Sequence, residues 1–381
     1  MNSWTSTESA PYERGHAFGA GLAPAIANTL AVYGRMFRED IGLDDAGIAA
    51  RGREVAQAVE QFRPDFAREI EGIAAGAGQP APLLFAVNAR TELLCGGIVA
   101  GVGGGECSTV AVVDADGRRA VLAQNWDFHP ALAASRVAWT VQRDQRTSFT
   151  GFTEAGILAK LGVNSHGVAI GINFLASDRD TGSGGLPVHM VVRAVLEEAR
   201  TLPEALELVE RTPMSSSVCM SVAGPQGDGT VGVVSLERWP GGVGRHLPSG
   251  TPPRLAHTNH FVAPIEASDL MTSGPLGGYT RSRYEQLVAA LDGEARCDVE
   301  TIARQLSSAE TPPGGQAVWR RVDESPPWLE RAATLATVAF EVPAGRFWLR
   351  GALDADAPFA PLELAGDARA SAPAAAAALT A

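Results

Sequence analysis

The stretch Glu106-Cys107-Ser108-Thr109-Val110-Ala111-Val112-Val113 places a cysteine where a glycine-rich loop changes into a strand. Residues 96–105, before it, are dominated by glycine, which leaves the backbone conformationally free. The apolar run after it predicts a strand that ends in the turn at residues 114–117. If the chain is cut before Cys107, the thiol and the new α-amine form a nucleophile and a base on one residue.

Composition restricts the function classes. The chain has 381 residues, 45% hydrophobic and 19% charged, which is typical of a globular protein. Its formal net charge of -12 argues against a nucleic-acid-binding surface, which would be basic. The N-terminus does not resemble a secretory signal, and no apolar run is long enough to span a bilayer. The chain has four cysteines, Cys95, Cys107, Cys219 and Cys297. They are widely spread and form no Cys-x-x-Cys pair, so we expect a reducing, cytoplasmic location.

Periodicity separates a helical region from a region of strands and helices. Residues up to about 94 are expected to be helical, with a clear apolar stripe over 49–62. After Cys107, alternation and turn residues predict hairpins. The expected strands cover 159–164, 167–174, 220–223, 230–236, 335–340 and 346–349, and the expected helices cover 187–199, 202–211, 282–291 and 299–306. This order predicts an α+β fold, with an alanine-rich, disordered tail over 366–381.

Cys107 need not be a nucleophile, and the loop before it need not serve a cut. A lone cysteine at the start of a strand is usually a small buried hydrophobe. The glycine-rich loop could instead bind phosphate, but it lacks the third glycine of a dinucleotide-binding loop and no Gly-Lys-Ser/Thr follows. The context of Cys107 must therefore decide its role.

Several segments together resemble a known family. They are Asn88-Ala89-Arg90-Thr91-Glu92, Glu106-Cys107-Ser108-Thr109, Gln124-Asn125-Trp126-Asp127-Phe128, Gly162-Val163-Asn164-Ser165-His166-Gly167-Val168, His257-Thr258-Asn259-His260-Phe261 and Ser282-Arg283-Tyr284. In this order they resemble the acyl-coenzyme A:6-aminopenicillanic acid acyltransferase family. These proteins are N-terminal-nucleophile (Ntn) hydrolases, distantly similar to bile-salt hydrolases and penicillin V acylases. The similarity spans roughly residues 15 to 350.

The resemblance implies a four-layer αββα sandwich with a helical N-terminal region. It also implies that the chain cuts itself between Glu106 and Cys107. The expected organisation is then a helical segment over residues 1–106, a catalytic core over 107–365 and the tail over 366–381. We expect the two fragments to stay associated, and the sequence leaves any higher oligomer open.

The resemblance also implies roles for four further residues. Asp127 would hold the α-amine of Cys107, because a hairpin returns it beside the nucleophile. Asn259 would donate its amide to the oxyanion, and Asn173 would complete that site through its amide or backbone N–H. Arg283 would lower the pKa of the thiol. Each of these four residues could instead have only a structural role, as a turn, strand-end or surface residue.

Two positions depart from the relatives, and no metal is predicted. The bile-salt hydrolase branch has an arginine where this chain has Gln124, and the penicillin acyltransferase has glycine where this chain has Glu106. His257 and His260 are expected on opposite faces of a strand end, with no evident third ligand. Neither a metal nor another cofactor is predicted.

The resemblance implies an enzyme that cleaves or forms a carbon–nitrogen amide bond of a small acylated amine through an S-acyl Cys107. Hydrolysis is slightly favoured, because acyl transfer needs a dedicated acceptor site. One alternative is an N-acyltransferase that uses acyl-coenzyme A. Another, from a different class, is an unprocessed protein that binds a small molecule on the same scaffold.

Overall fold

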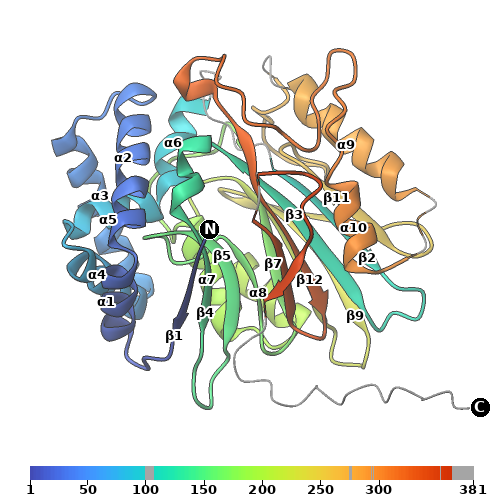
Figure 1. Ribbon diagram of the computed structural model, residues 1–381, viewed down its shortest axis with the longest axis horizontal. Helices are drawn as coiled ribbons and strands as arrows, with labels where there is room; N and C mark the ends of the chain where they lie inside the picture. The colour runs from blue at the N-terminus through green and yellow to red at the C-terminus, as the bar shows by residue number, and fades with distance from the viewer. Residues whose placement is uncertain (99–106, 274–276, 293, 295, 352, 363–381) are drawn as a thin grey trace, which may run out of the picture.

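Two facing β-sheets form the centre of the molecule in the computed structural model, which describes residues 1–98, 107–273, 277–292, 294, 296–351 and 353–362. The predicted cut after Glu106 and the predicted disordered tail over 366–381 lie outside these residues. Figure 1 shows the N-terminal helices gathered on one side of the sheets and helices α9 and α10 on the other.

Within the described residues, the larger sheet has eight strands. Their order is β1-β4-β5-β6-β7-β8-β9-β10, antiparallel except for the pair β1 and β4. The bounds are β1 (Asn2–Ser6), β4 (Arg136–Val141), β5 (Phe149–Glu154), β6 (Leu161–Asn164), β7 (Ala169–Phe174), β8 (Val218–Pro225), β9 (Val231–Trp239) and β10 (Gly242–His246). At the predicted turn between β6 and β7, Gly167 has φ 76°, a conformation that favours glycine.

The smaller sheet has six strands in the described part of the chain, all antiparallel, in the order β11-β2-β3-β12-β13-β14. The bounds are β2 (Ser108–Val113), β3 (Ala120–Phe128), β11 (Arg254–His257), β12 (Ala333–Val342), β13 (Arg346–Arg350) and β14 (Ala360–Leu362). Every residue of β2 and β3 is buried. These strands therefore have both faces covered, which explains why β2 is a nearly continuous apolar run.

Helices cover the outer face of each sheet. Helices α7 (Val188–Glu198) and α8 (Leu202–Arg211) pack on the larger sheet, and α9 (Gly277–Leu291) and α10 (Val299–Gln305) pack on the smaller one. The inner faces of the two sheets contact each other through β2, β3 and β12 on one side and β7, β8 and β9 on the other. The result is the four-layer αββα arrangement that the sequence predicted.

The N-terminal region is helical, as predicted, but it also supplies an edge strand that the sequence analysis missed. Its helices are α1 (Pro11–Gly21), α2 (Ala23–Glu39), α3 (Asp45–Phe62), α4 (Pro64–Ala77), α5 (Ala81–Asn88) and α6 (Arg90–Ile98), and short 3₁₀ turns lie later in the chain at Pro130–Ser135 and Trp328–Glu330. Strand β1 pairs in parallel with β4. In the described part of the chain no single helix could cross a membrane, although the bent pair of α1 and α2 passes that test on length and composition.

Glycines let α1 and α4 pack closely. Gly15 and Gly19 lie one turn apart on α1, and Gly72 and Gly76 do so on α4. A Cβ added at Gly72 would lie 2.2 Å from the carbonyl oxygen of Tyr12, so no larger residue fits without movement. The glycines therefore set how closely α1 and α4 approach each other.

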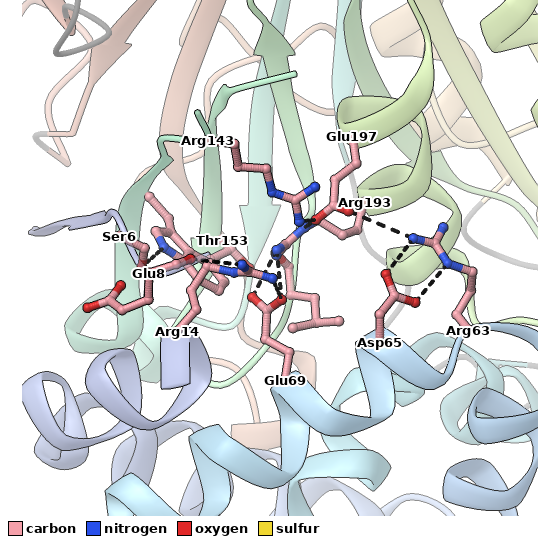
Figure 2. Close-up of polar contacts among 12 residues, drawn as sticks. Ser6, Glu8, Arg14, Arg63, Asp65, Glu69, Arg143, Thr153, Arg193 and Glu197 are labelled. Carbon is pink, nitrogen blue, oxygen red and sulfur yellow. Dashed lines mark hydrogen bonds and ion pairs between the residues drawn. The ribbon is translucent and has the colours of Figure 1, made fainter. Parts of the chain in front are cut away.

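A buried network of ion pairs joins the N-terminal helices to the remainder of the fold (Figure 2). Glu69 on α4 accepts from Arg14 on α1 and from Arg193 on α7, at 2.5 Å and 2.8 Å. Arg193 also pairs with Glu197 at 2.6 Å, and Arg143 pairs with the same carboxylate. Burial alone would raise the pKa of Glu69, but the two arginines hold it below its usual value. The network therefore connects elements on either side of the predicted cut.

Candidate active site

The hairpin of β2 and β3 brings Cys107 beside Asp127. Cys107 immediately precedes β2, and Ser108 pairs with Asn125 on β3. The strand register therefore returns Asp127 to the nucleophile, with the Cys107 Sγ 3.9 Å from the Asp127 carbonyl oxygen. The Cys107 side chain is 2% exposed. The two residues are neighbours in space although twenty positions separate them.

The Asp127 carboxylate is buried without a hydrogen bond. Neither of its oxygens has a partner of suitable geometry among the described residues. Thr334 lies opposite it on β12, close to the carboxylate but outside hydrogen-bond geometry. Burial raises the pKa of Asp127 to about 7, although Thr334 and Arg283 act in the opposite direction. Such a group has unused hydrogen-bonding capacity, and its residue lines the same pocket as Cys107.

Helix α9 supplies Arg283, whose guanidinium reaches the backbone of the nucleophile. Its Nη1 donates to the Cys107 carbonyl oxygen at 2.9 Å and to the Ser108 hydroxyl at 3.1 Å. Its Nη2 donates to Asn259 Oδ1 at 3.1 Å. Arg283 is 1% exposed, so the structural reading of a surface arginine is wrong. This one side chain links two predicted site residues.

Asn173, on β7 of the opposite sheet, also contacts the nucleophile. Its Nδ2 donates to the Cys107 carbonyl oxygen at 3.2 Å, and its Oδ1 accepts from the Thr109 hydroxyl at 2.8 Å. The amide therefore holds the backbone of Cys107 in this structure. Its predicted part in the oxyanion site stays a prediction.

Asn259 lies in the segment after β11. Its Nδ2 donates to the Phe174 carbonyl oxygen at 3.0 Å, and its backbone N–H donates to Thr280 at 2.8 Å. One N–H of the amide is thus used to place the side chain, and the other is suited to an oxyanion. The side chain is fully buried next to Arg283.

The sequence analysis missed Glu237, a carboxylate on β9 that anchors the segment carrying Asn259. It accepts from His257 at 2.7 Å and from the backbone N–H groups of Val262 and Ala263 at 2.7 Å and 2.9 Å. Burial alone would lower the pKa of His257, but Cys219 and Glu237 raise it well above its usual value. The sequence offered one sign of such a role, because Glu237 is the single acidic residue in the mostly apolar strand β9.

Burial dominates the acidity of the Cys107 thiol. It raises the pKa of the thiol to about 11, and the nearby Asp127 carboxylate adds to that effect. Arg283 and Arg90 lower it, as predicted for Arg283, but they do not outweigh burial. The thiol of the uncut chain is therefore protonated at neutral pH and needs a base to become a nucleophile.

Gln124, the first departure from the relatives, makes only neutral contacts. Its side chain exchanges hydrogen bonds with the backbone N–H and carbonyl of Ile172, the former at 3.0 Å. A Cβ at Gly171 would lie 2.4 Å from Gln124 Oε1, so glycine makes room for this contact. Gln124 thus joins the two sheets and adds no charge to the site. The second departure, Glu106, lies outside the described residues.

A narrow pocket lies beside the nucleophile. Its free volume of about 20 Å³ is roughly that of one water molecule. The lining residues are mostly apolar: Arg90, Thr91, Cys107, Trp126, Asp127, Phe128, Ile172, Phe174, Val188 and Val218. Among the described residues, no group of three histidine, cysteine or acidic side chains lies close enough to hold a metal ion.

Comparison with known proteins agrees with this arrangement. Residues 113–351 match the family model described as acyl-coenzyme A:6-aminopenicillanic acid acyl-transferase. The chain is 28% identical over 286 residues to the acyl-coenzyme A:6-aminopenicillanic-acid-acyltransferase 40 kDa form of Emericella nidulans, covering 74% of this chain and 76% of that protein.

Solved structures with a similar chain path include two hydrolases. One is an arginine-to-leucine variant of conjugated bile acid hydrolase from Clostridium perfringens, with a TM-score of 0.47 and 12% identity over 68% of this chain and 92% of that one. The other is penicillin V acylase from Agrobacterium tumefaciens, with a TM-score of 0.40 and 12% identity over 64% of this chain and 83% of that one.

The family model covers more than half of the chain, and it lies over both sheets and the helices that cover them. It begins at the last residue of β2 and ends just after β13, so it contains the segments of Asp127, Asn173, Asn259 and Arg283. Both the predicted family and the predicted class of enzyme are confirmed. The chain belongs to the acyl-coenzyme A:6-aminopenicillanic acid acyltransferase family.

Proposed function

We propose that this protein cuts itself before Cys107 and then acts on the carbon–nitrogen amide bond of a small acylated amine through an S-acyl Cys107. One observation carries the proposal: Cys107 lies beside Asp127, whose buried carboxylate has no hydrogen bond among the described residues, in a site completed by Asn259 and Arg283. A buried carboxylate without a partner costs stability. A free α-amine on Cys107 would supply the missing partner.

The cut would proceed through the thiol of Cys107. The sulfur attacks the carbonyl carbon of residue 106, and the 106–107 C–N bond breaks to give a thioester and a free α-amine. Water then hydrolyses the thioester and leaves a carboxylate on residue 106. Asn173 and Arg283 support this step, because both hold the Cys107 carbonyl and so fix the backbone beside the bond that breaks.

Turnover would use the new α-amine as the base. A free α-amine has a pKa near 8, so it can take the thiol proton near neutral pH, and Asp127 stabilises the resulting ammonium. The thiolate attacks the substrate carbonyl, and the amide of Asn259 donates to the oxyanion. The amine then leaves with the proton from the α-ammonium, and water or an acceptor amine releases the acyl group from Cys107.

Hydrolysis is the favoured outcome, because water is always present and the pocket offers no evident acceptor site. Acyl transfer from acyl-coenzyme A is a second candidate, since the curated relative at 28% identity is named for that reaction. A binding protein without processing is less consistent with the site. It would gain nothing from Asp127, whose buried carboxylate lacks a hydrogen bond among the described residues.

Trapping the acyl-enzyme tests the proposal. The purified protein is mixed with a panel of acyl p-nitroanilides, quenched in acid and digested. We expect an acyl adduct on the peptide that begins with Cys107, and no adduct in Cys107→Ala. Adding an amine, or an acyl-coenzyme A donor together with an amine, then separates transfer from hydrolysis by its product. Adducts on other residues alone would refute the proposed nucleophile.

A further inference from the structure

Arg90 lies in the pocket of the nucleophile, but the proposed chemistry does not use it. It is the first residue of α6, it is 6% exposed, and it lines the same pocket as Cys107. Its guanidinium carbon lies over three aromatic rings, 4.5 Å from the centre of Phe128, 5.4 Å from Trp126 and 5.7 Å from Tyr33. The residue is therefore held rigidly at the wall of the pocket.

The guanidinium of Arg90 lacks a counter-ion in the described part of the chain. Its Nε is buried without a hydrogen-bond partner, and no described carboxylate lies within ion-pair distance of it. Arg193, by contrast, pairs with both Glu69 and Glu197. Glu92, on the same helix as Arg90, accepts from the backbone N–H of Val188 instead. A buried cation without a partner is costly, and an anion would remove that cost.

A second basic group lies next to Arg90, and burial and the charge of Arg90 hold its pKa well below the usual value. Lys160, the only lysine of the chain, is fully buried, and its Nζ lies 4.2 Å from the centre of the Trp126 ring. Its partner is Glu154, at 3.1 Å, and that carboxylate also accepts from the Tyr33 hydroxyl at 2.6 Å. The two basic side chains thus lie over the same rings, and the nearby carboxylate pairs with Lys160. Arg90 lines the pocket and has no such partner among the described residues.

From this arrangement we infer that Arg90 binds a carboxylate of the amide substrate. Arginine presents a planar set of donors that matches a carboxylate, and the burial of the site makes that recognition selective. The pocket wall beside it is mostly apolar and aromatic, which suits methylene groups between the carboxylate and the amide. The free volume is that of about one water molecule, so the wall side chains must move to admit them. The substrate class is therefore an acylated amine with a free carboxylate, and this inference rests on the proposed function.

The test compares substrates that differ only in charge. Glutaric acid mono-p-nitroanilide is compared with pentanoyl p-nitroanilide, and N-pentanoyl-4-aminobenzoate is compared with N-pentanoylaniline. The first pair has the carboxylate on the acyl side and the second on the amine side. For one of the two pairs, we expect kcat/KM of the wild type to be about 10- to 100-fold higher for the substrate with the carboxylate than for its neutral counterpart. In Arg90→Gln that ratio falls to near 1, because kcat/KM falls much more for the charged substrate than for the neutral one. The loss on the neutral substrate reflects only the effect of Arg90 on the thiol. Arg53→Gln, on the exposed surface of α3, serves as the control and keeps the preference.

Alkylation of Cys107 by iodoacetamide separates this role from an effect on the thiol. Arg90 lowers the pKa of the thiol, so Arg90→Gln slows alkylation. A loss of the preference for the carboxylate beyond that slowing supports carboxylate binding. An equal loss on charged and neutral substrates with slower alkylation would overturn it. A wild-type ratio near 1 for both pairs would also overturn it, while leaving the proposed amidase intact.

A binding measurement on the wild type keeps the inference testable without turnover or a stable variant. At fixed ionic strength, glutarate should slow the alkylation of Cys107 by iodoacetamide more than neutral glutaramide does. Equal protection by the two compounds would refute carboxylate binding. If no amide is hydrolysed but glutarate protects selectively, the proposed function fails and the inferred site stands.

Discussion

At the scale of single residues, the site contains a group that is poorly suited to the uncut chain. Asp127 is buried, has no hydrogen bond among the described residues, and has a pKa of about 7. Its folded pKa is raised above the unfolded value of 3.8. The contribution of Asp127 to the free energy of unfolding is therefore complete below pH 3.8 and is lost as the pH rises through 7. Catalytic groups often carry such a cost, because the reaction needs them in that environment.

Replacing this carboxylate should stabilise the uncut chain at neutral and higher pH. In a Cys107→Ala background, Asp127→Asn should raise the free energy of unfolding at pH 8 by up to about 4 kcal/mol and change it little at pH 4. Urea unfolding at the two pH values measures the difference. Asp116→Asn, at an exposed turn, serves as the control. A destabilised variant at pH 8 would show that Asp127 has a structural partner.

The sequence pointed to residues that lie together in the structure, but it did not show how they contact one another. The segments around Asp127, Asn173 and Arg283 led to side chains that the structure brings to Cys107. The net effect on the thiol could not be predicted, because burial depends on the packed layers and outweighs the charge of Arg283. The role of Arg90 was also missed, since a free guanidinium is recognised only when its surroundings are known.

At the scale of elements, the segment after β11 is positioned from the opposite sheet. Glu237 on β9 accepts three hydrogen bonds from this segment, two from backbone N–H groups and one from His257. Asn259 lies between those contacts. We therefore expect that Glu237 positions the oxyanion site without touching the substrate.

The pair of His257 and Glu237 gives a pH-dependent contribution to stability. The folded pKa of His257 is raised, so its contribution is complete below the unfolded value near 6.5 and is lost as pH rises through the folded pKa. The wild type should therefore lose thermal stability above about pH 6.5 relative to His257→Gln. Melting curves from pH 6 to pH 10 measure this, with the exposed His16→Gln as control. Parallel curves for wild type and His257→Gln would refute a charged His257.

Element prediction succeeded where periodicity or turn residues were strong. The hairpin of β6 and β7 has a glycine turn, and α8 has a clear apolar stripe. Strands β1, β4, β5, β10 and β14 were missed. Strand β1 is short and pairs with a distant segment, so its strand character comes from tertiary contacts that no local pattern reveals.

At the scale of the whole molecule, the N-terminal region and the core are joined by buried polar contacts. Glu69 connects α1 and α4 to α7 through Arg14 and Arg193. Asn88, at the end of α5, donates to the Gly156 carbonyl at 2.7 Å and accepts from the Leu158 N–H at 3.0 Å. These contacts do not depend on the peptide bond before Cys107, so the two fragments are expected to copurify after a cut.

Glu69→Gln should weaken that association strongly. It leaves the buried guanidinium of Arg14 without a charged partner and removes one of the two carboxylates that pair with Arg193. Breaking a buried ion pair costs about 3–5 kcal/mol in comparable sites. We expect the fragments to separate at a clearly lower urea concentration, measured by size-exclusion chromatography. Glu71→Gln on the same helix removes an exposed pair with Arg68 and should have little effect. An equal shift for both variants would show that the buried network does not hold the fragments.

Intact-mass spectrometry of the freshly purified protein tests the central claim most directly. The account predicts two polypeptides for the wild type, one of residues 1–106 and one of 275 residues (381 − 106) that begins at Cys107. Cys107→Ala should give one chain of 381 residues. An uncut wild-type chain with the same mass pattern as the variant would contradict the account.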